Sequence, residues 1–290
     1  MNGDLVLVSG RECHNENIAS GPYEDLYIYH IRGSVSHKDE QTLGEHFMGN
    51  WVEDDYSFLF FSNKSNEILS EFIRSRPGLE LIDDYCFTYE QWQGGGLAPF
   101  RVDSFTIMPP WARVRSENGE IRLLLDPGVV FGNGLHPTTR DCLKAMCHVN
   151  ETQKFKRVLD LGTGSGILAI AAAYLGAMDI LAVDLNPLCV KTAKRNARLN
   201  GYEDIIKIVT GLAEDFAEDK RDLVVANIHY EAIKGLFKHE GFLESERLII
   251  SGLLRTQASD IRDRIKLHGL KVINEWDHEM TWYTLLVGKS

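Results

Sequence analysis

Hydrophobic and polar residues alternate between strand and helix patterns from about residue 157 to the C-terminus. Short, branched apolar runs such as "RVLDL" and "LVVAN" are typical of parallel strands buried on both faces. The predicted strands occupy residues 157–161, 180–184, 206–210, 222–227 and 246–251, and the predicted helices occupy 166–175, 188–199, 230–238 and 255–267.

Two more strand patterns, at residues 270–276 and 282–288, follow each other without a helical pattern between them. They predict a hairpin that closes the sheet, so that one edge strand runs antiparallel to the rest of the sheet. We therefore expect the α/β class, with a Rossmann-like seven-stranded sheet that ends in an antiparallel hairpin.

The first hundred residues predict a smaller α+β unit. Its strand patterns occupy residues 25–33, 55–62 and 79–89, and its helical patterns occupy 37–49 and 66–76. These elements favour a ferredoxin-like arrangement.

A segment with the composition of a linker, "QGGGLAP", follows at residues 93–99. Further strand patterns at 100–111 and 121–126 flank the turn "SENGE". We therefore expect three parts: an N-terminal α+β domain at 1–92, a linker with lead-in strands at 93–120, and the larger α/β domain at 121–290.

Composition narrows the function classes. The net charge of -11 argues against general nucleic-acid binding, which needs a basic face. The longest apolar stretch is broken by Gly176 and Asp179, so no membrane span is expected. Five scattered cysteines without a CxxC pair argue against a disulfide scaffold or a zinc site and favour the reducing cytoplasm. No metal site is expected, and the oligomeric state is left open.

A glycine-rich loop lies in "VLDLGTGSGILAIAAA", residues 158–173, between a predicted strand and a predicted helix. Gly162, Gly164 and Gly166 would let the backbone pass close to a ligand, and the free amides of the helix favour an anionic group. The alternative is close packing of strand on helix with nothing bound. "GSGILA" also fits a dinucleotide-binding pattern.

Three polar residues accompany this loop. Asp160, inside the first strand, is expected to organise the loop or meet a ligand, because a buried carboxylate is otherwise costly. Asp184 ends the second strand, where an acid can accept both hydroxyls of a ribose; Asn186 already suits the cap of the next helix. Asn227 ends the fourth strand and can hold an amine nucleophile or, alternatively, cap a helix.

The segment "LLLDPGVVFGNGLHPTTRDCL", residues 123–143, concentrates special residues in a loop. Its glycines predict tight turns over a ligand, and Phe131 can cover that ligand. Thr138 is predicted to be the N-cap of the next helix, with Asp141 completing a capping box and Thr139 in the first turn. His136 is expected to shape the turn rather than transfer protons.

These motifs resemble the class I S-adenosylmethionine-dependent methyltransferases. "LDPGVVFGNGLHPTTRDCL" is similar to the "DPG-x-AFGTG-x-H-x-TT" segment of the PrmA family, which methylates large-subunit ribosomal protein eleven. The resemblance covers roughly residues 100–290. It implies S-adenosylmethionine as cofactor, a small N-terminal domain that docks the protein, and protein-lysine N-methyltransferase activity on a basic ribosomal protein.

The expected site follows from the motifs and the resemblance together. Asn227 would orient the amine, and helix-start amides with a threonine hydroxyl would seat the methionine carboxylate of the donor. "NIHYEAI" departs from the family, which has small or apolar residues there, so His229 and Tyr230 would reshape the acceptor pocket or merely begin a helix. The expected cofactor-binding residues are Phe131, Gly134, Thr139, Asp160, Gly162, Gly164, Gly166, Asp184 and Asn227, and the expected catalytic residues are Asn227, His229 and Tyr230.

Three alternatives stay open at this point. The same chemistry could act on a different protein. A nicotinamide-dependent oxidoreductase would fit "GSGILA" and Asp184 but leaves "FGNGLHPTT" and Asn227 unexplained. A binding module could hold the donor without turnover.

Overall fold

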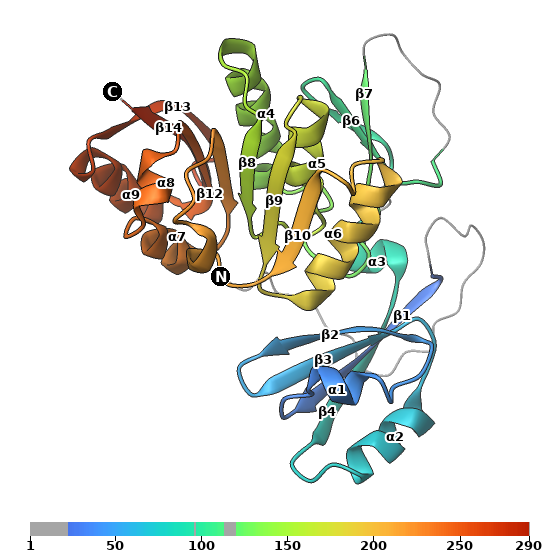
Figure 1. The fold of residues 1–290 in the computed structure, drawn as a ribbon. Coiled ribbons are helices and arrows are strands. Elements are labelled where there is room, and N and C mark those ends of the chain that lie inside the picture. Colours follow the sequence, from blue (N-terminus) through green and yellow to red (C-terminus); the bar gives the residue numbers. More distant parts are fainter. Residues whose placement is uncertain (1–22, 96, 113–119, 290) are drawn as a thin grey trace. The chain divides into compact units, whose positions relative to one another are not determined.

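The computed structural model describes residues 23–95, 97–112 and 120–289 (Figure 1). The chain forms two compact units, Met1–Leu97 and Ala98–Ser290. The boundary falls inside the segment 93–120 that the sequence predicts as a connection. Most of the predicted turn "SENGE" lies outside the described residues.

The N-terminal unit is an antiparallel sheet with strand order β2-β3-β1-β4. Leu69 and Phe72 of the amphipathic helix α2 are buried against the sheet residues Tyr29, Leu59 and Phe61. Its elements are β1 (Asp25–Arg32), α1 (His37–Glu40), β2 (Phe47–Glu53), β3 (Tyr56–Phe61), α2 (Asn66–Arg74), β4 (Glu80–Thr88) and α3 (Tyr89–Gln93).

The helix predicted at 37–49 is wrong beyond Glu40. Gly44 has φ +79°, a left-handed conformation that does not continue a helix, and Phe47 begins a strand paired with β3. The backbone hydrogen bonds of this segment are thus made across a hairpin. Tertiary pairing overrides the weak local helical pattern here.

The larger unit is built on a sheet with strand order β10-β9-β8-β11-β12-β14-β13, in which β8 to β12 are parallel. This confirms the α/β class and the mostly parallel sheet. The strands are β8 (Arg157–Leu161), β9 (Asp179–Asp184), β10 (Ile206–Thr210), β11 (Leu223–Asn227), β12 (Arg247–Leu254), β13 (Leu270–His278) and β14 (Trp282–Lys289).

Helices cover both faces of this sheet (Figure 1), and two buried clusters fill the spaces between. One face carries α4 (Pro137–Thr152), α5 (Ile167–Tyr174) and α6 (Pro187–Leu199). The other carries α7 (Tyr230–Leu236), α8 (Glu240–Glu244) and α9 (Arg255–Leu267). Successive residues of a strand point to opposite faces, so Val158 joins the first cluster and Leu159 the second.

The terminal hairpin is present, but the predicted position of the antiparallel strand is wrong. β14 pairs antiparallel with both β12 and β13, so the antiparallel strand is inserted next to the edge, and β13 is the edge strand. Burial explains the order, because six consecutive residues of β14 are buried whereas β13 exposes alternate residues. The more apolar strand takes the interior place.

A small third sheet precedes α4. The strand predicted at 100–111 is divided by a turn at Asp103, φ +53°, into β5 (Phe100–Val102) and β6 (Phe105–Met108). β7 (Ile121–Leu124) pairs with β6 in parallel. Phe105 and Leu123 are fully buried against the cluster of α4 and α5.

Among the described residues, no helix is long and apolar enough to span a bilayer, and no group of three His, Cys, Asp or Glu side chains could hold a metal ion. Cys142, Cys147 and Cys189 are buried and free. Cys86 in β4 is disulfide-bonded, which the scattered cysteine pattern did not predict.

Candidate functional site

The strand alternation brings three predicted site residues to one face of the sheet. Asp160 pairs with Ala182 of β9 and with Val225 of β11. Asp184 and Asn227 lie two residues beyond those partners, so all three side chains point to the face covered by α4 and α5. They stand at the carboxyl ends of neighbouring strands, where open α/β sheets bind ligands.

The glycine loop needs its glycines because neighbouring protein atoms lie close. Gly162, Gly164 and Gly166 have φ values of +73°, +54° and +87°. A Cβ on Gly164 would lie 2.8 Å from the carbonyl oxygen of Phe131, and one on Gly166 would lie 3.1 Å from Cα of Ala193. These contacts support the packing alternative for the glycines, and the N–H groups of residues 162–166 already donate hydrogen bonds within the protein.

Substituting Gly164 tests this close approach. We expect Gly164→Ala to lower the free energy of unfolding by about 2–4 kcal/mol, since left-handed strain and displacement of the Phe131 carbonyl add together. Gly201→Ala is the matched control, because Gly201 has φ +73° and open space around its Cβ position. The control should lose only about 1 kcal/mol. Urea unfolding measures both, and equal losses would contradict the steric explanation.

The loop at 128–139 is joined to the glycine loop. The Ser165 N–H donates to the Phe131 carbonyl over 3.1 Å, and the Ser165 hydroxyl donates to the Gly132 carbonyl over 2.6 Å. Gly134, φ +83°, leaves no room for a Cβ, which would lie 2.8 Å from the ring of Phe100. The two loops therefore form one structure at the edge of the sheet.

Asp184 is half-buried, and both of its carboxylate oxygens accept hydrogen bonds from backbone N–H groups. Its Oδ2 accepts from the Gly164 N–H over 2.8 Å, and its Oδ1 accepts from the Asn186 N–H over 2.9 Å. Each carboxylate oxygen keeps a further lone pair for a ligand hydroxyl. The helix cap is Asn186, as predicted, which accepts from the Leu188 N–H.

Asp160 is buried beneath the loop. Its Oδ2 accepts from the Thr163 hydroxyl over 2.7 Å and from the Ala169 N–H over 3.1 Å, and its Oδ1 has no partner among the described residues. Burial raises the pKa of Asp160 to about 7, and the Asp184 carboxylate adds to the rise. Asp160 thus holds the glycine loop in place, which is one of the two roles predicted for it.

The raised pKa of Asp160 has a consequence for stability. Below about pH 4 the carboxyl is protonated in the folded and unfolded states alike. As the pH rises toward 7, only the unfolded state ionises readily, so the wild type loses up to about 4 kcal/mol, and above pH 7 the loss is constant. Asp160→Asn lacks this ionisation. We therefore expect the free energy of unfolding of Asp160→Asn, relative to that of wild type, to be higher at pH 8 than at pH 5. Urea unfolding at both values tests this, with the exposed Asp204→Asn as control; a relative loss would contradict it.

The predicted N-cap Thr138 is wrong by two residues. Helix α4 begins at Pro137, and its N-cap is His136, whose Nδ1 accepts from the Thr138 N–H. Burial and the neighbouring His278 lower the pKa of His136, which favours the neutral ring that can accept this hydrogen bond. Asp141 pairs with Lys144 over 2.8 Å instead of completing a capping box. Proline at the first helical position explains the shift.

Thr139 lies in the first turn of α4, as predicted. Its hydroxyl is buried and has no hydrogen-bond partner among the described residues. An unpaired buried hydroxyl is costly unless a ligand or water meets it. Thr139 at the helix start therefore fits a ligand carboxylate.

A row of rings borders this helix start. Phe131 is 58% exposed, and its ring centroid lies 5.5 Å from that of His136, which in turn lies 5.0 Å from that of Trp282. Trp282 is missing from the sequence-predicted site. It belongs to β14, and only the inserted position of that strand brings it to the loop. In the sequence, the only indication that Trp282 could belong to the site is its position at the start of the last apolar strand.

Asn227 is half-buried, and its side chain makes no hydrogen bond to another described residue. The helix-capping alternative does not hold, because α7 begins at Tyr230 with His229 as its N-cap residue. His229 is exposed and makes no capping side-chain bond. The Tyr230 hydroxyl donates to Asp260 on α9 over 2.8 Å, so that hydroxyl is engaged in holding two helices together.

Comparisons with known proteins agree with this geometry. Residues 88–290 match the family model described as ribosomal protein L11 methyltransferase (PrmA). A ribosomal protein L11 methyltransferase of Staphylococcus epidermidis is 34% identical over 264 residues, covering 86% of this chain and 81% of the relative. One from Staphylococcus carnosus is 33% identical, covering 78% of this chain and 76% of the relative. 

Among solved structures, a ribosomal protein L11 methylase from Lactobacillus delbrueckii subsp. bulgaricus is similar to this chain, with a TM-score of 0.58 and 29% identity. The match covers 64% of this chain and 95% of the solved one.

Proposed function

Because the chain belongs to the ribosomal protein L11 methyltransferase (PrmA) family, we propose that it methylates amino groups of lysine residues in ribosomal protein L11, with S-adenosylmethionine as donor. Family membership makes the chain a methyltransferase. The family match over residues 88–290 carries the proposal, since it spans the loop at 128–139, the glycine loop, and the residues Asp160, Asp184 and Asn227 at the strand ends.

The residues at the sheet edge fit such a donor. Asp184 would accept the ribose hydroxyls, and Thr139 with the α4 amides would bind the methionine carboxylate. The exposed ring of Phe131 would cover the bound molecule. S-adenosylmethionine supplies an electrophilic methyl group on a sulfonium.

The chain's part in the transfer is alignment of the amine. Good alignment of two reactants is worth up to about 7–11 kcal/mol of the barrier. A lysine has an unperturbed pKa of about 10.4 and must lose its proton; the aromatic surroundings of Phe131 and Trp282 would lower this pKa by desolvation. The Asn227 amide oxygen can accept a hydrogen bond from the neutral amine and direct its lone pair. His229 at the α7 start would border the acceptor, while Tyr230 would support it through α9.

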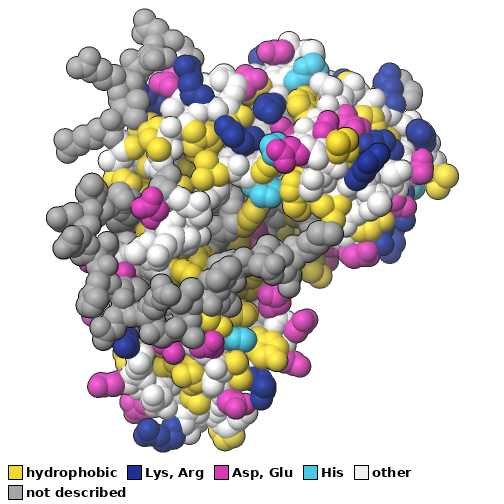
Figure 2. Space-filling view, turned by 180° about the vertical axis from the view of Figure 1, so that it is seen from behind, with side chains coloured by type: hydrophobic (Ala, Val, Ile, Leu, Met, Phe, Trp, Pro, Cys, Tyr) yellow, Lys and Arg dark blue, Asp and Glu magenta, His cyan; other side chains and the backbone are white. Residues whose placement is uncertain are grey.

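The N-terminal unit would dock the protein substrate. Its β-α-β-β-α-β order with strand order β2-β3-β1-β4 supports a ferredoxin-like classification. The net charge of -11 would attract a basic ribosomal protein. On the face of the larger unit seen in Figure 2, basic and acidic side chains are interspersed rather than gathered in one basic patch. The cytoplasmic location stays a prediction from the sequence.

Label transfer tests the proposal directly. The purified protein is incubated with radiolabelled S-adenosylmethionine and ribosomal proteins from a strain that lacks the enzyme. We expect a labelled L11 band with methyllysine on hydrolysis, and no label with the donor-site variant Asp184→Asn. Label in another protein would mean that the substrate is not L11. Binding of NADH instead of S-adenosylmethionine, measured by calorimetry, would favour the oxidoreductase alternative.

A further inference from the structure

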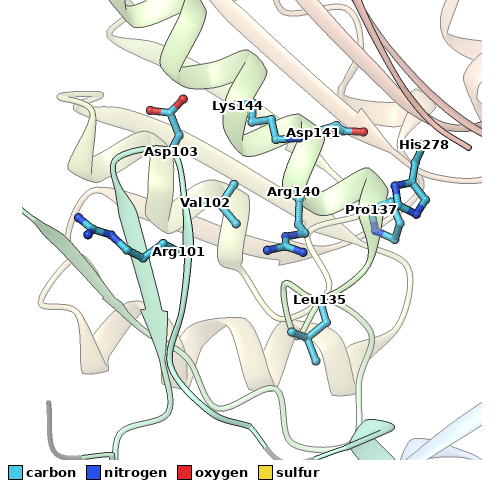
Figure 3. A pocket seen from close by; sticks show the side chains of 9 residues that line it. All are labelled: Arg101, Val102, Asp103, Leu135, Pro137, Arg140, Asp141, Lys144 and His278. Carbon is cyan, nitrogen blue, oxygen red and sulfur yellow. Dashed lines mark hydrogen bonds and ion pairs between the residues drawn. The ribbon is translucent and has the colours of Figure 1, made fainter.

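A cavity of about 470 Å³ opens beside the first turns of α4 (Figure 3). This volume lies in the range of small-ligand sites. The β5–β6 turn, the first turns of α4 and the end of β13 form its walls. Its charged or titratable lining residues are Arg101, Asp103, Arg140, Asp141, Lys144 and His278.

Arg140 lines this cavity and has no acidic partner among the described residues. Lys144 forms an ion pair with Asp141, with 2.8 Å between Nζ and Oδ1. The half-buried Arg140 guanidinium lies 5.6 Å from the ring centroid of Phe100, and no described carboxylate pairs with it. Figure 3 shows Arg140 near the centre of the labelled residues and the Asp103 carboxylate away from it. A guanidinium held in this way can bind a carboxylate through two parallel hydrogen bonds.

The cavity adjoins the loop at 128–139. Leu135 and Pro137, on either side of His136, line it. His278, another lining residue, is paired in the hairpin with Trp282, whose ring contacts His136. A polypeptide with its amine beside Phe131 and Trp282 would therefore place a neighbouring residue close to this cavity.

We propose that Arg140 binds an acidic side chain of the protein substrate beside the methylated amine, and so determines which amines are accepted. The inference rests on the proposed function, since it names a further part of the same substrate. The net charge of -11 attracts basic proteins without discriminating among them. A guanidinium in a cavity, without an acidic partner among the described residues, adds the requirement for one carboxylate at one position.

The test compares Arg140→Gln and Arg140→Lys with wild type on full-length L11. We expect Arg140→Gln to raise KM at least about tenfold, the effect of losing one charge-assisted pair, with kcat and donor affinity unchanged. Arg140→Lys should recover part of the loss because it keeps the charge but not the paired geometry. Arg198→Gln, on an arginine that is outside the cavity lining and mostly exposed, is the control for the change in net charge.

Substrate variants identify the partner of Arg140. Each Asp or Glu of L11 is changed singly to its amide, and KM is measured with both enzymes. One variant should raise KM for wild type as much as Arg140→Gln does and cause no further rise with that enzyme. An unchanged KM for Arg140→Gln, effects that add for every substrate variant, or a weakened donor affinity would each overturn the inference.

Failure of the proposed function would look different. In that case wild type transfers no label to L11 at all. Glutarate binding to the full chain, measured by calorimetry, then decides the acid-binding claim: Arg140→Gln must weaken it at least about tenfold, whereas equal affinity of both proteins rejects the site.

Discussion

Replacing Asp184 by asparagine is expected to weaken S-adenosylmethionine binding by about 100- to 1000-fold. The loss corresponds to about 3–4 kcal/mol, the sum of two hydrogen bonds from ribose hydroxyls to a charged acceptor. Asparagine has nearly the same size, and its one oxygen can still accept from the Gly164 N–H, whose bond to Asp184 is 2.8 Å long. Calorimetry with S-adenosylmethionine measures the affinity.

The matched control for Asp184 is Asp204→Asn, an exposed aspartate of the same unit whose replacement should leave donor affinity unchanged. Thermal unfolding of both variants checks that the fold is intact. If the Asp184 variant kept its affinity within about threefold of wild type, the ribose role would be wrong, because even one lost charged hydrogen bond exceeds that factor.

Replacing Asn227 by alanine is expected to lower kcat about a hundredfold or more. The amine would lose the acceptor that directs its lone pair, and misplacement by about 1 Å costs roughly this factor. The fold should tolerate the change, because the Asn227 side chain makes no hydrogen bond to another described residue. Single-turnover label transfer to L11 measures the chemical step apart from binding.

A second substitution at Asn227 separates orientation from donor binding. Asn227→Asp would place a negative charge beside the amine and favour its protonated form, so the pH at which activity rises should move upward. Asn227→Ala should not cause such a movement. If instead both variants lost donor affinity as much as kcat, Asn227 would act on the donor and not on the amine.

The positions of the site residues on their strands were predictable because strand periodicity is a property of short segments. Asp184 and Asn227 each follow an apolar run and end their strands, and Asp160 lies one residue before the end of β8. Asp160 and Asp184 lie on successive strands that pair with each other. Asn227 joins them only because β11 pairs with β8 in the tertiary structure.

Local helix signals were less informative. Thr138 has a residue type that is common at helix N-caps. Pro137, however, occupies the first helical position, which proline favours, so the N-cap is the residue before it, His136. The helix predicted at 37–49 ends at Glu40, because Gly44 adopts a left-handed conformation and Phe47 begins β2, which pairs with β3. In both places a neighbouring constraint outweighed residue propensity.

The class of the fold, the glycine loop, and the positions of Asp160, Asp184 and Asn227 at or near strand ends could be predicted, since each depends on periodicities within about thirty residues. The packing of distant segments, in contrast, places β14 beside β12, brings Trp282 to His136, and leaves Arg140 in a cavity without an acidic partner among the described residues. The contact of His136 with Trp282 joins residues more than a hundred positions apart, the place of β14 depends on how many of its residues the packed sheet buries, and the state of Arg140 depends on which side chains are already paired. The burial of a residue and the pairing of its charge depend on contacts from all parts of the folded unit, so a local sequence pattern does not predict them.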